Sequence, residues 1–441
     1  MNEWQEAEQR VERAGELFAQ RRLREALEEL RAAISINPSN PQWHYNLGLV
    51  LDGLERFDEA VQAFDRAVEL CPDFAEAAYH AGICLMRLGR AAEAIARFDA
   101  VEAIDASFEP AYCARVSAYT ALGDHDKAEE MFYLGRQYRE ECPHCYYAIA
   151  ESLYRRGMLD RAIYCWQRAL DLDESAPMAH MRIAEAYRAQ GDFEKARVHY
   201  LQQMRITPQR CEPLLALGSL LMDMGHLEQA GEKFHRAMDL APHEAAVHYH
   251  MGRWLAATGQ SDAAEAALEQ ALRLEPSQRG AHLEMARLCL RRGDDVQARR
   301  HLRAEMECGG HGPGMLLDLA DLMLDCGMHR AAVAALRRVV AAEPGNVAAW
   351  VALGAGHFML REFADGAQAS RRALRCDRSC VAAIYNMALA CYEQGRLRPA
   401  LVWLRRALRI DPSDVGARAL NLRVRIAALW RRIASAMKRG A

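Results

Sequence analysis

The hydrophobic residues of this chain recur with helical spacing, and the whole pattern repeats every 34 residues. Within each repeat the apolar positions fall at i, i+3, i+4 and i+7, as on one face of an α-helix. A small residue marks the same position in twelve successive repeats: Ala26, Ala60, Ala94, Ala128, Ala162, Ala196, Ala230, Ala264, Ala298, Ala332, Gly366 and Ala400. The twelve repeats cover residues 7–414, with 1–6 before them and 415–441 after.

Two further columns of the repeat predict how its helices pack. Twelve residues before the marker stands another small residue in every repeat except the one with Val116. Four residues after the marker stands a large apolar residue, with Ser370 as the exception. Small residues let two antiparallel helices approach closely, and the large residue fills the space beside them. All 14 prolines fall at repeat ends or in first turns, so each repeat predicts a helical hairpin.

These columns resemble the tetratricopeptide repeat family, whose pattern has a small residue at position 8, alanine at 20, an aromatic residue or leucine at 24 and proline at 32. Clear examples are HYNLGLVLDGLERFDEAVQAFDRAVELCP and HYHMGRWLAATGQSDAAEAALEQALRLEP. The resemblance implies an all-α fold, an α-solenoid in which about twelve hairpins stack into an elongated right-handed superhelix. It also implies that the first helix of each hairpin lines a concave groove. Residues 415–441 are then predicted to form one more helix, which caps the apolar face of the twelfth repeat.

Three repeats depart from the family pattern, and we expect them to pack less well than the others. The departing residues are Arg13 in the first repeat, Arg115, Val116 and Gly135 in the fourth, and His357, Gly366 and Ser370 in the eleventh. A glycine-rich junction over 309–314 separates the ninth and tenth repeats. Glycine's conformational freedom makes this junction a candidate hinge, and the alternative is a loop without motion.

The composition fits a folded protein, with 51% hydrophobic and 26% charged residues. The net charge of −4 excludes a globally basic nucleic-acid binder, but residues 361–441 alone contain 17 basic and 6 acidic residues, a net charge of +11. No apolar run reaches the length of a membrane span, and the polar start predicts no secretory signal. We therefore expect a cytoplasmic protein whose 13 cysteines are mostly reduced.

Motifs that would carry catalysis are missing from the sequence, which has no GxxxxGK[ST], HExxH or GxSxG. We expect no enzyme, no cofactor and no small-molecule substrate. The segment Cys142-Pro143-His144-Cys145 matches the tetrapeptide of thioredoxin-type oxidoreductases, and a helix N-terminus there would lower the pKa of Cys142. The alternative is a repeat boundary at which Pro143 opens a helix. We expect no metal site, because the next close cysteine pair lies seven repeats further on.

The histidines at position 4 of their repeats, His44, His180, His248 and His282, are interpreted as packing or capping residues, with a ligand role as the alternative. The groove is the better candidate for a site, because tyrosine and arginine are the residues that most often anchor protein interfaces. The resemblance places these candidate residues on the concave face: Tyr45, Asn46, Tyr79, His80, Tyr147, Tyr154, Arg182, Tyr249, His250, Arg253, Arg287, Tyr385 and Asn386. The alternative is that the tyrosines half pack against the neighbouring repeat.

The sequence therefore favours an interaction scaffold that binds extended protein or peptide segments in its groove. The alternative is a peripheral adaptor anchored to a membrane surface, or less readily to nucleic acid, through residues 415–441. That segment is basic and contains no acidic residue, with Arg418, Arg423, Arg425, Arg431, Arg432, Lys438 and Arg439. Its apolar side contains Leu422, Ile426, Leu429, Trp430 and Ile433. A simple cap with a solvated outer face is the competing interpretation of the same helix.

Overall fold

The computed structural model describes residues 3–174, 176 and 178–440, and for residues 3 and 432–440 it describes the backbone alone. The described residues form 25 α-helices and no strand, as the periodicity predicts. The helices are α1 (Glu3–Ala19), α2 (Leu23–Ile36), α3 (Pro41–Gly53), α4 (Phe57–Leu70), α5 (Ala75–Arg87), α6 (Ala91–Ile104), α7 (Glu109–Leu122), α8 (His125–Tyr138), α9 (Pro143–Arg155), α10 (Leu159–Leu172), α11 (Ala179–Gln190), α12 (Phe193–Ile206), α13 (Glu212–Asp223), α14 (Leu227–Leu240), α15 (Ala245–Ala257), α16 (Ser261–Leu274), α17 (Ala281–Arg291), α18 (Asp295–Cys308), α19 (Pro313–Asp325), α20 (His329–Ala342), α21 (Val347–Met359), α22 (Phe363–Cys376), α23 (Val381–Glu393), α24 (Leu397–Ile410) and α25 (Val415–Gly440).

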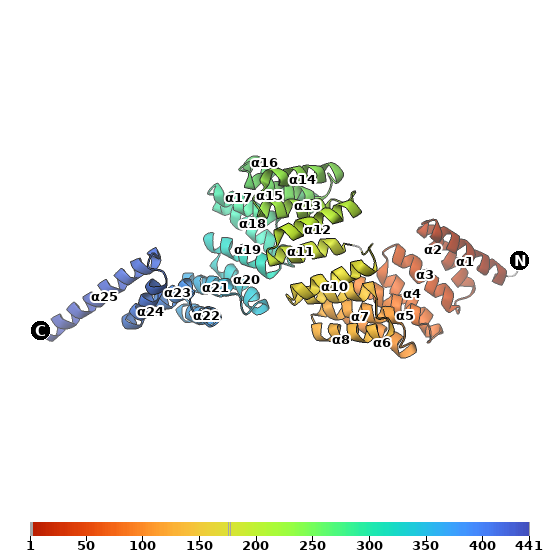
Figure 1. Cartoon of the computed structure of the whole chain (residues 1–441), viewed down its shortest axis with the longest axis horizontal. Helices are drawn as coiled ribbons and strands as arrows, with labels where there is room; N and C mark the ends of the chain where they lie inside the picture. Colours follow the sequence, from red (N-terminus) through yellow and green to blue (C-terminus); the bar gives the residue numbers. More distant parts are fainter. Residues whose placement is uncertain (1–2, 175, 177, 441) are drawn as a thin grey trace. The chain divides into compact units, whose positions relative to one another are not determined.

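Each odd-numbered helix from α1 to α23 pairs with the even-numbered helix that follows it, and the two are the first and second helices of one hairpin (Figure 1). The chain divides into two compact units, residues 1–220 and 221–441, and the boundary falls within α13. Each unit is a stack of hairpins. The helix α1 begins at Glu3, so residues 3–6 belong to the first helix instead of forming a separate segment.

The small and large columns of the sequence meet inside each hairpin. A Cβ atom built on Gly48 would lie 2.5 Å from Cε1 of Phe64, and one built on Gly82 would lie 2.4 Å from the same atom of Phe98. Phe64 and Phe98 are fully buried, as are Trp166, Tyr200 and Phe234 in later repeats. The predicted close approach of the two helices around one large side chain is confirmed.

The turn between the two helices of a hairpin contains a residue whose backbone adopts the left-handed helical conformation, with a positive φ angle. Gly123 and Gly191, for example, have φ angles of 77° and 80°. The same position holds Arg21, Glu55 and Arg361 in three repeats, with φ angles of 60° to 61°. A non-glycine residue in this conformation costs about 1 kcal/mol, which the packing of the two flanking helices must offset.

The buried polar residues of the fourth and eleventh repeats form polar contacts, and the expectation that the departing repeats pack less well stays a prediction. Arg115 is buried, and it forms an ion pair of 2.8 Å with Asp99 and a second with Glu102. His357 is buried with its Nδ1 2.6 Å from Glu362 Oε2, and buried Ser370 donates to the Gly366 carbonyl oxygen at 2.8 Å. Each polar side chain finds a partner from a neighbouring turn or helix, which compensates its burial.

The glycine-rich junction is anchored by a buried pair of side chains. Gly309 and Gly310 have φ angles of 69° and 67°, which turn the chain so that His311 is buried. The His311 Nε2 atom lies 2.6 Å from the carbonyl oxygen of Glu305. The Glu305 carboxylate in turn accepts from the amides of Gly280 and Leu283 at the start of α17, at 2.9 and 3.1 Å. These contacts tie the loop to α17, and whether the junction acts as a hinge stays a prediction.

Candidate partner-binding groove

The first helices contribute five tyrosines at the same repeat position: Tyr45, Tyr79, Tyr147, Tyr249 and Tyr385. We call them the groove tyrosines, and all five are half-buried. The Tyr45 ring lies 5.0 Å, centroid to centroid, from Phe74 of the next repeat, and Tyr79 lies 5.4 Å from Phe108. The rings of Tyr45 and Tyr79 therefore pack on the following repeat and keep part of their surface accessible, and the partner-binding role of the groove tyrosines stays a prediction.

Two of the groove tyrosines line one pocket of about 410 Å³ in the first unit. Tyr79 comes from α5 and Tyr147 from α9, and between them α7 contributes Glu109. The exposed side chains of Arg139 and His144 complete the polar part of the rim. The pocket combines apolar walls with groups of both charge signs, an arrangement suited to a segment that carries both apolar and polar side chains.

A second pocket, of about 460 Å³, lies in the second unit along α21 and α23. Tyr385 and Asn386 line it together with Phe358, Phe363 and the exposed Met359. Asn386 itself is buried, so it is less available to a partner than the sequence suggests. Like the pocket at Tyr79 and Tyr147, it has aromatic rings in its wall.

Arginines and acidic residues form a ladder across the first helices of each unit. In the first unit Arg182 donates to Glu185 at 2.9 Å and lies 3.8 Å from Glu151. In the second unit Arg287 bridges Glu284 at 2.8 Å and Asp318 at 2.9 Å. Arg253 joins that ladder, 3.8 Å from Glu284. The predicted groove arginines are therefore already paired, and a partner would have to exchange with these carboxylates.

The remaining candidates have mainly local contacts. Asn46 accepts a hydrogen bond from Gln42 at 3.1 Å and lines a small pocket of about 140 Å³ beside α1. His80 lies 5.7 Å from the Tyr45 ring, and burial lowers its pKa. His250 stacks on Phe234 at 5.9 Å, and Tyr154 lies 5.8 Å from Trp166. Tyr249 has the guanidinium of Arg253 5.7 Å from its ring centroid.

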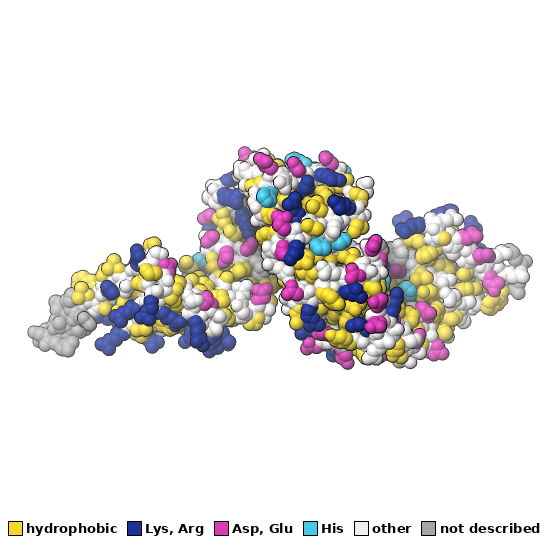
Figure 2. Space-filling model, in the orientation of Figure 1, with side chains coloured by type: hydrophobic (Ala, Val, Ile, Leu, Met, Phe, Trp, Pro, Cys, Tyr) yellow, Lys and Arg dark blue, Asp and Glu magenta, His cyan; other side chains and the backbone are white. Residues whose placement is uncertain are grey.

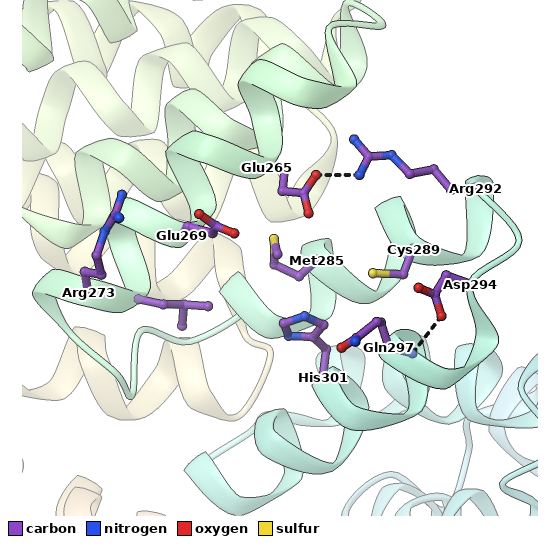
Figure 3. Close-up of a pocket in the computed structure, with 10 residues that line it drawn as sticks. Glu265, Glu269, Arg273, Met285, Cys289, Arg292, Asp294, Gln297 and His301 are labelled. Atoms are coloured by element: carbon purple, nitrogen blue, oxygen red, sulfur yellow. Dashed lines mark hydrogen bonds and ion pairs between the residues drawn. The ribbon is translucent and has the colours of Figure 1, made fainter.

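The sequence reasoning missed a pocket on the second-helix side of the second unit. This pocket, of about 540 Å³, lies among α16, α17 and α18 (Figure 3). Its lining includes an ion pair between Arg292 and Glu265 and the imidazole of His301. No motif marks these residues in the sequence, since they are spaced like any solvated helix face.

The position-4 histidines have the packing and capping contacts that we favoured. His44 and His248 lie 2.9 and 2.8 Å from the carbonyl oxygens of Pro38 and Pro242, at the end of the preceding repeat. His180 and His282 instead pair with His199 and His301 on the second helix of the same hairpin, with Nδ1 atoms 3.0 Å apart in both pairs. Burial lowers the pKa of His199 to about 4, and the charge of His180 acts in the same direction.

The Cys-Pro-His-Cys segment lies at the repeat boundary, where Pro143 opens α9 and Cys142 is the N-cap residue. The expected lowering of the Cys142 pKa is wrong. Burial raises that pKa to about 11, and the hydrogen bond with Glu109 acts in the same direction. The disulfide in this region joins Cys145 to Cys113 of α7, not to Cys142. The helix dipole is outweighed here because the thiol is withdrawn from water beside a carboxylate.

The basic end of the chain combines a cap with an exposed apolar stripe. Ala417, Leu420 and Val424 of α25 are buried, which agrees with the capping interpretation. The apolar side that we named does not pack: Leu422 is 61% and Trp430 66% exposed, and Ile426 and Leu429 are exposed as well. The side chains of Arg432, Ile433, Lys438 and Arg439 lie outside the described residues.

Lys and Arg side chains gather over the part of the chain that holds α22, α24 and α25 (Figure 2). Exposed arginines of this surface include Arg371, Arg372, Arg375, Arg405, Arg406, Arg409, Arg423 and Arg425. Within the described residues, no helix is both long enough and apolar enough to span a bilayer.

Stacked helical hairpins with a groove of first-helix side chains define the class of α-solenoid repeat proteins. Family models described as tetratricopeptide repeat match residues 11–73, 51–107, 147–210, 249–313 and 360–415, and further models of the same description match 109–134, 221–273 and 313–356. Because these matches cover more than half of the chain, the protein belongs to the tetratricopeptide repeat family.

Comparison with curated proteins gives no match. Among solved structures, the chain is similar to the Cut9–Hcn1 hetero-tetramer of the APC/C, at 14% identity and a TM-score of 0.47, over 93% of this chain and 95% of that one. It is similar to yeast Tom70 at 15% identity and a TM-score of 0.40, over 97% of both chains. A tetratricopeptide repeat protein from Parabacteroides merdae matches at 16% identity and a TM-score of 0.49, over 57% of this chain and 99% of that one. Similarity at this level concerns the fold alone.

Proposed function

We propose that this protein is a scaffold that binds an extended segment of a partner protein along the face formed by its first helices. The observation that carries the proposal is the pocket at Tyr79 and Tyr147, which joins two groove tyrosines with the charged rim of Glu109 and Arg139. Membership of a family whose members generally bind proteins or peptides supports it. Tyrosine suits this role because it brings a large contact area with only two side-chain torsions to fix.

The proposal can be tested at Tyr147, because the same repeat supplies a matched control. Tyr147→Ala removes a half-buried groove tyrosine, whereas Tyr164→Ala removes a tyrosine that is 59% exposed on the second helix, α10. We expect Tyr147→Ala to weaken capture of the native partner about tenfold or more, since truncated anchors typically cost more than ~1 kcal/mol. Tyr164→Ala should change little. Loss of capture by Tyr164→Ala alone would instead favour a site on the second-helix side.

A second candidate function is attachment to an anionic membrane surface through α25. The exposed apolar stripe of Leu422, Ile426, Leu429 and Trp430, next to Arg423 and Arg425, favours it over a simple cap. A helix with this division of side chains can lie in the headgroup region of a bilayer, with its arginines on anionic lipids. The cytoplasmic location expected from the sequence stays a prediction.

A further inference from the structure

Three sulfur atoms and one carboxylate converge between α7 and α9. The ligand atoms of Glu109, Cys113, Cys142 and Cys145 all lie within 4.8 Å of one another. The three cysteines are buried, and Glu109 keeps 13% of its side chain exposed. Thiolate and carboxylate groups in one cluster are ligand types that zinc accepts.

Apart from the Cys113–Cys145 pair, which a disulfide joins, the distances within the cluster approach the edges of a zinc tetrahedron. Zinc–sulfur bonds of about 2.3 Å and zinc–oxygen bonds of about 2.0 to 2.2 Å give edges of about 3.8 Å between two sulfurs and about 3.5 Å between sulfur and oxygen. The Sγ atoms of Cys113 and Cys142 are 3.6 Å apart. Glu109 Oε1 lies 3.5 Å from Cys145 Sγ and 3.1 Å from Cys113 Sγ.

The helices present these ligands from their N-terminal turns. Glu109 and Cys113 are one turn apart at the start of α7, and Cys142 and Cys145 occupy the N-cap and first turn of α9. Both helix ends carry partial positive charge, which favours anionic ligands. The Cys145 amide also donates to Cys142 Sγ at 3.4 Å.

The departure of the fourth repeat from the family pattern makes room for this cluster. Its Gly135 stands where most repeats have alanine or valine. A Cβ atom there would lie 3.0 Å from Tyr112 Cβ and 3.6 Å from Cys145 Sγ. The missing side chain therefore leaves space beside one of the sulfurs.

From this geometry we propose that, in the reduced protein, Glu109, Cys113, Cys142 and Cys145 bind one zinc ion. Binding releases three thiol protons to solvent, so three thiolates and the Glu109 carboxylate surround the ion with a net charge of −2. Arg139, whose Nη1 lies 3.8 Å from Glu109 Oε2, partly offsets that charge. The ion has an entry path, because Glu109 and Cys113 line the pocket of about 410 Å³ at the groove.

The disulfide between Cys113 and Cys145 and the zinc site exclude each other. While the disulfide is intact, only Cys142 and Glu109 can serve as ligands. A phosphine restores the two thiols by giving two electrons and becoming its oxide, while water supplies the oxygen and the two protons; a dithiol gives both electrons and protons and becomes a disulfide. The two sulfurs can then separate by side-chain rotation. The ion would then tie α7 to α9 in place of the covalent bond.

The test uses the full chain, reduced with a phosphine, freed of metal and titrated with Co²⁺ as a spectroscopic substitute for zinc. We expect a thiolate-to-cobalt charge-transfer band that saturates at one ion per chain and disappears when Zn²⁺ is added. Substitutions in residues that merely support a metal ligand cost about 10- to 100-fold in affinity, so Cys142→Ser should cost at least about 100-fold and Glu109→Gln about 10-fold or more. Cys165→Ser is the matched control, since Cys165 is a buried cysteine of the repeat that holds Cys145 and lies outside the cluster.

Circular dichroism shows whether the variants fold, and Zn²⁺ should raise the melting temperature of the reduced wild type but not of Cys142→Ser. The proposal is overturned if the reduced wild type gives no charge-transfer band. It is also overturned if Cys142→Ser keeps the band at full affinity, or if Cys165→Ser loses it equally. A Cys113–Cys145 disulfide that resists the phosphine, seen by mass spectrometry, would contradict it as well.

Discussion

Gly48 and Gly15 are both helical glycines, but only Gly48 faces an aromatic ring. We expect Gly48→Ala to lower the free energy of unfolding by about 1 to 3 kcal/mol, because the new methyl group overlaps the fully buried Phe64. Gly15→Ala should raise stability by about 0.5 to 1 kcal/mol, because nothing lies within 4 Å of its Cβ position and alanine favours the helix. Thermal unfolding of both variants measures this difference. Equal shifts of the melting temperature would show that the contact between Gly48 and Phe64 does not restrict the side chain at position 48.

The His180–His199 pair predicts a loss of stability in mild acid. In the folded protein the His199 pKa is about 4, while in the unfolded chain it takes its ordinary value near 6.5. Between these values the unfolded chain binds more protons, so the free energy of unfolding falls as the pH drops through this window, and the contribution is fully present above it.

His199→Gln removes this proton uptake, so its melting temperature should fall less between pH 7 and pH 5 than that of the wild type. Exposed His243→Gln is the control and should follow the wild type. The same acid slope in His199→Gln and wild type would contradict the linkage.

At the scale of an element, α17 begins with a cap that comes from another helix. Glu305 of α18 is fully buried and accepts from the amides of Gly280 and Leu283. Glu305→Ala should cost about 2 kcal/mol or more, because two hydrogen bonds to a charged group are lost and their donors stay buried. Hydrogen exchange would localise the effect: these two amides should lose protection, while those of α5 in the other unit keep theirs. Unchanged protection at Gly280 and Leu283 would contradict the capping role.

The exposed stripe of α25 predicts binding to anionic bilayers. Leu429→Glu with Trp430→Glu should abolish flotation with phosphatidylserine vesicles, and binding by the wild type should weaken as salt is added. Val296→Glu, at an apolar residue that is 75% exposed on α18, is the matched control. If the same fraction of the double variant and of the wild type floats with the vesicles, the membrane interpretation is wrong and α25 is a cap with a solvated outer face.

The elements themselves could be predicted from the sequence, because a helical hairpin is specified by contacts between residues close along the chain. The small and large columns of the sequence predicted the packing of Gly48 on Phe64. The cysteine cluster could not be predicted in the same way, since Cys145 belongs to the fifth repeat and meets Cys113 of the fourth repeat only when the two hairpins stack. Two local signals were present: Glu109 and Cys113, spaced one helical turn apart, and the pair Cys142 and Cys145.

For the whole molecule, a repeat array makes each hairpin depend on its neighbours, so the first-helix face of each unit is built from adjacent first helices. The resemblance predicted which side chains stand on that face, and their role in binding a partner stays a prediction. It did not reveal that the groove arginines are paired across repeats or that Asn386 is buried, because both depend on the rotation of one hairpin against the next.

The central claim is that a partner occupies the first-helix face, and site-specific photo-crosslinking tests it most directly. A photoreactive phenylalanine analogue would replace Tyr147 on α9 in one protein and Tyr164 on α10 in another, so that the two probes lie in one repeat on opposite helices. Both proteins would be irradiated with the native partner after circular dichroism has shown that they fold. We predict a crosslink to the partner from position 147 and none above background from position 164. A crosslink from position 164 without one from position 147 would contradict the account and place the partner on the second-helix side.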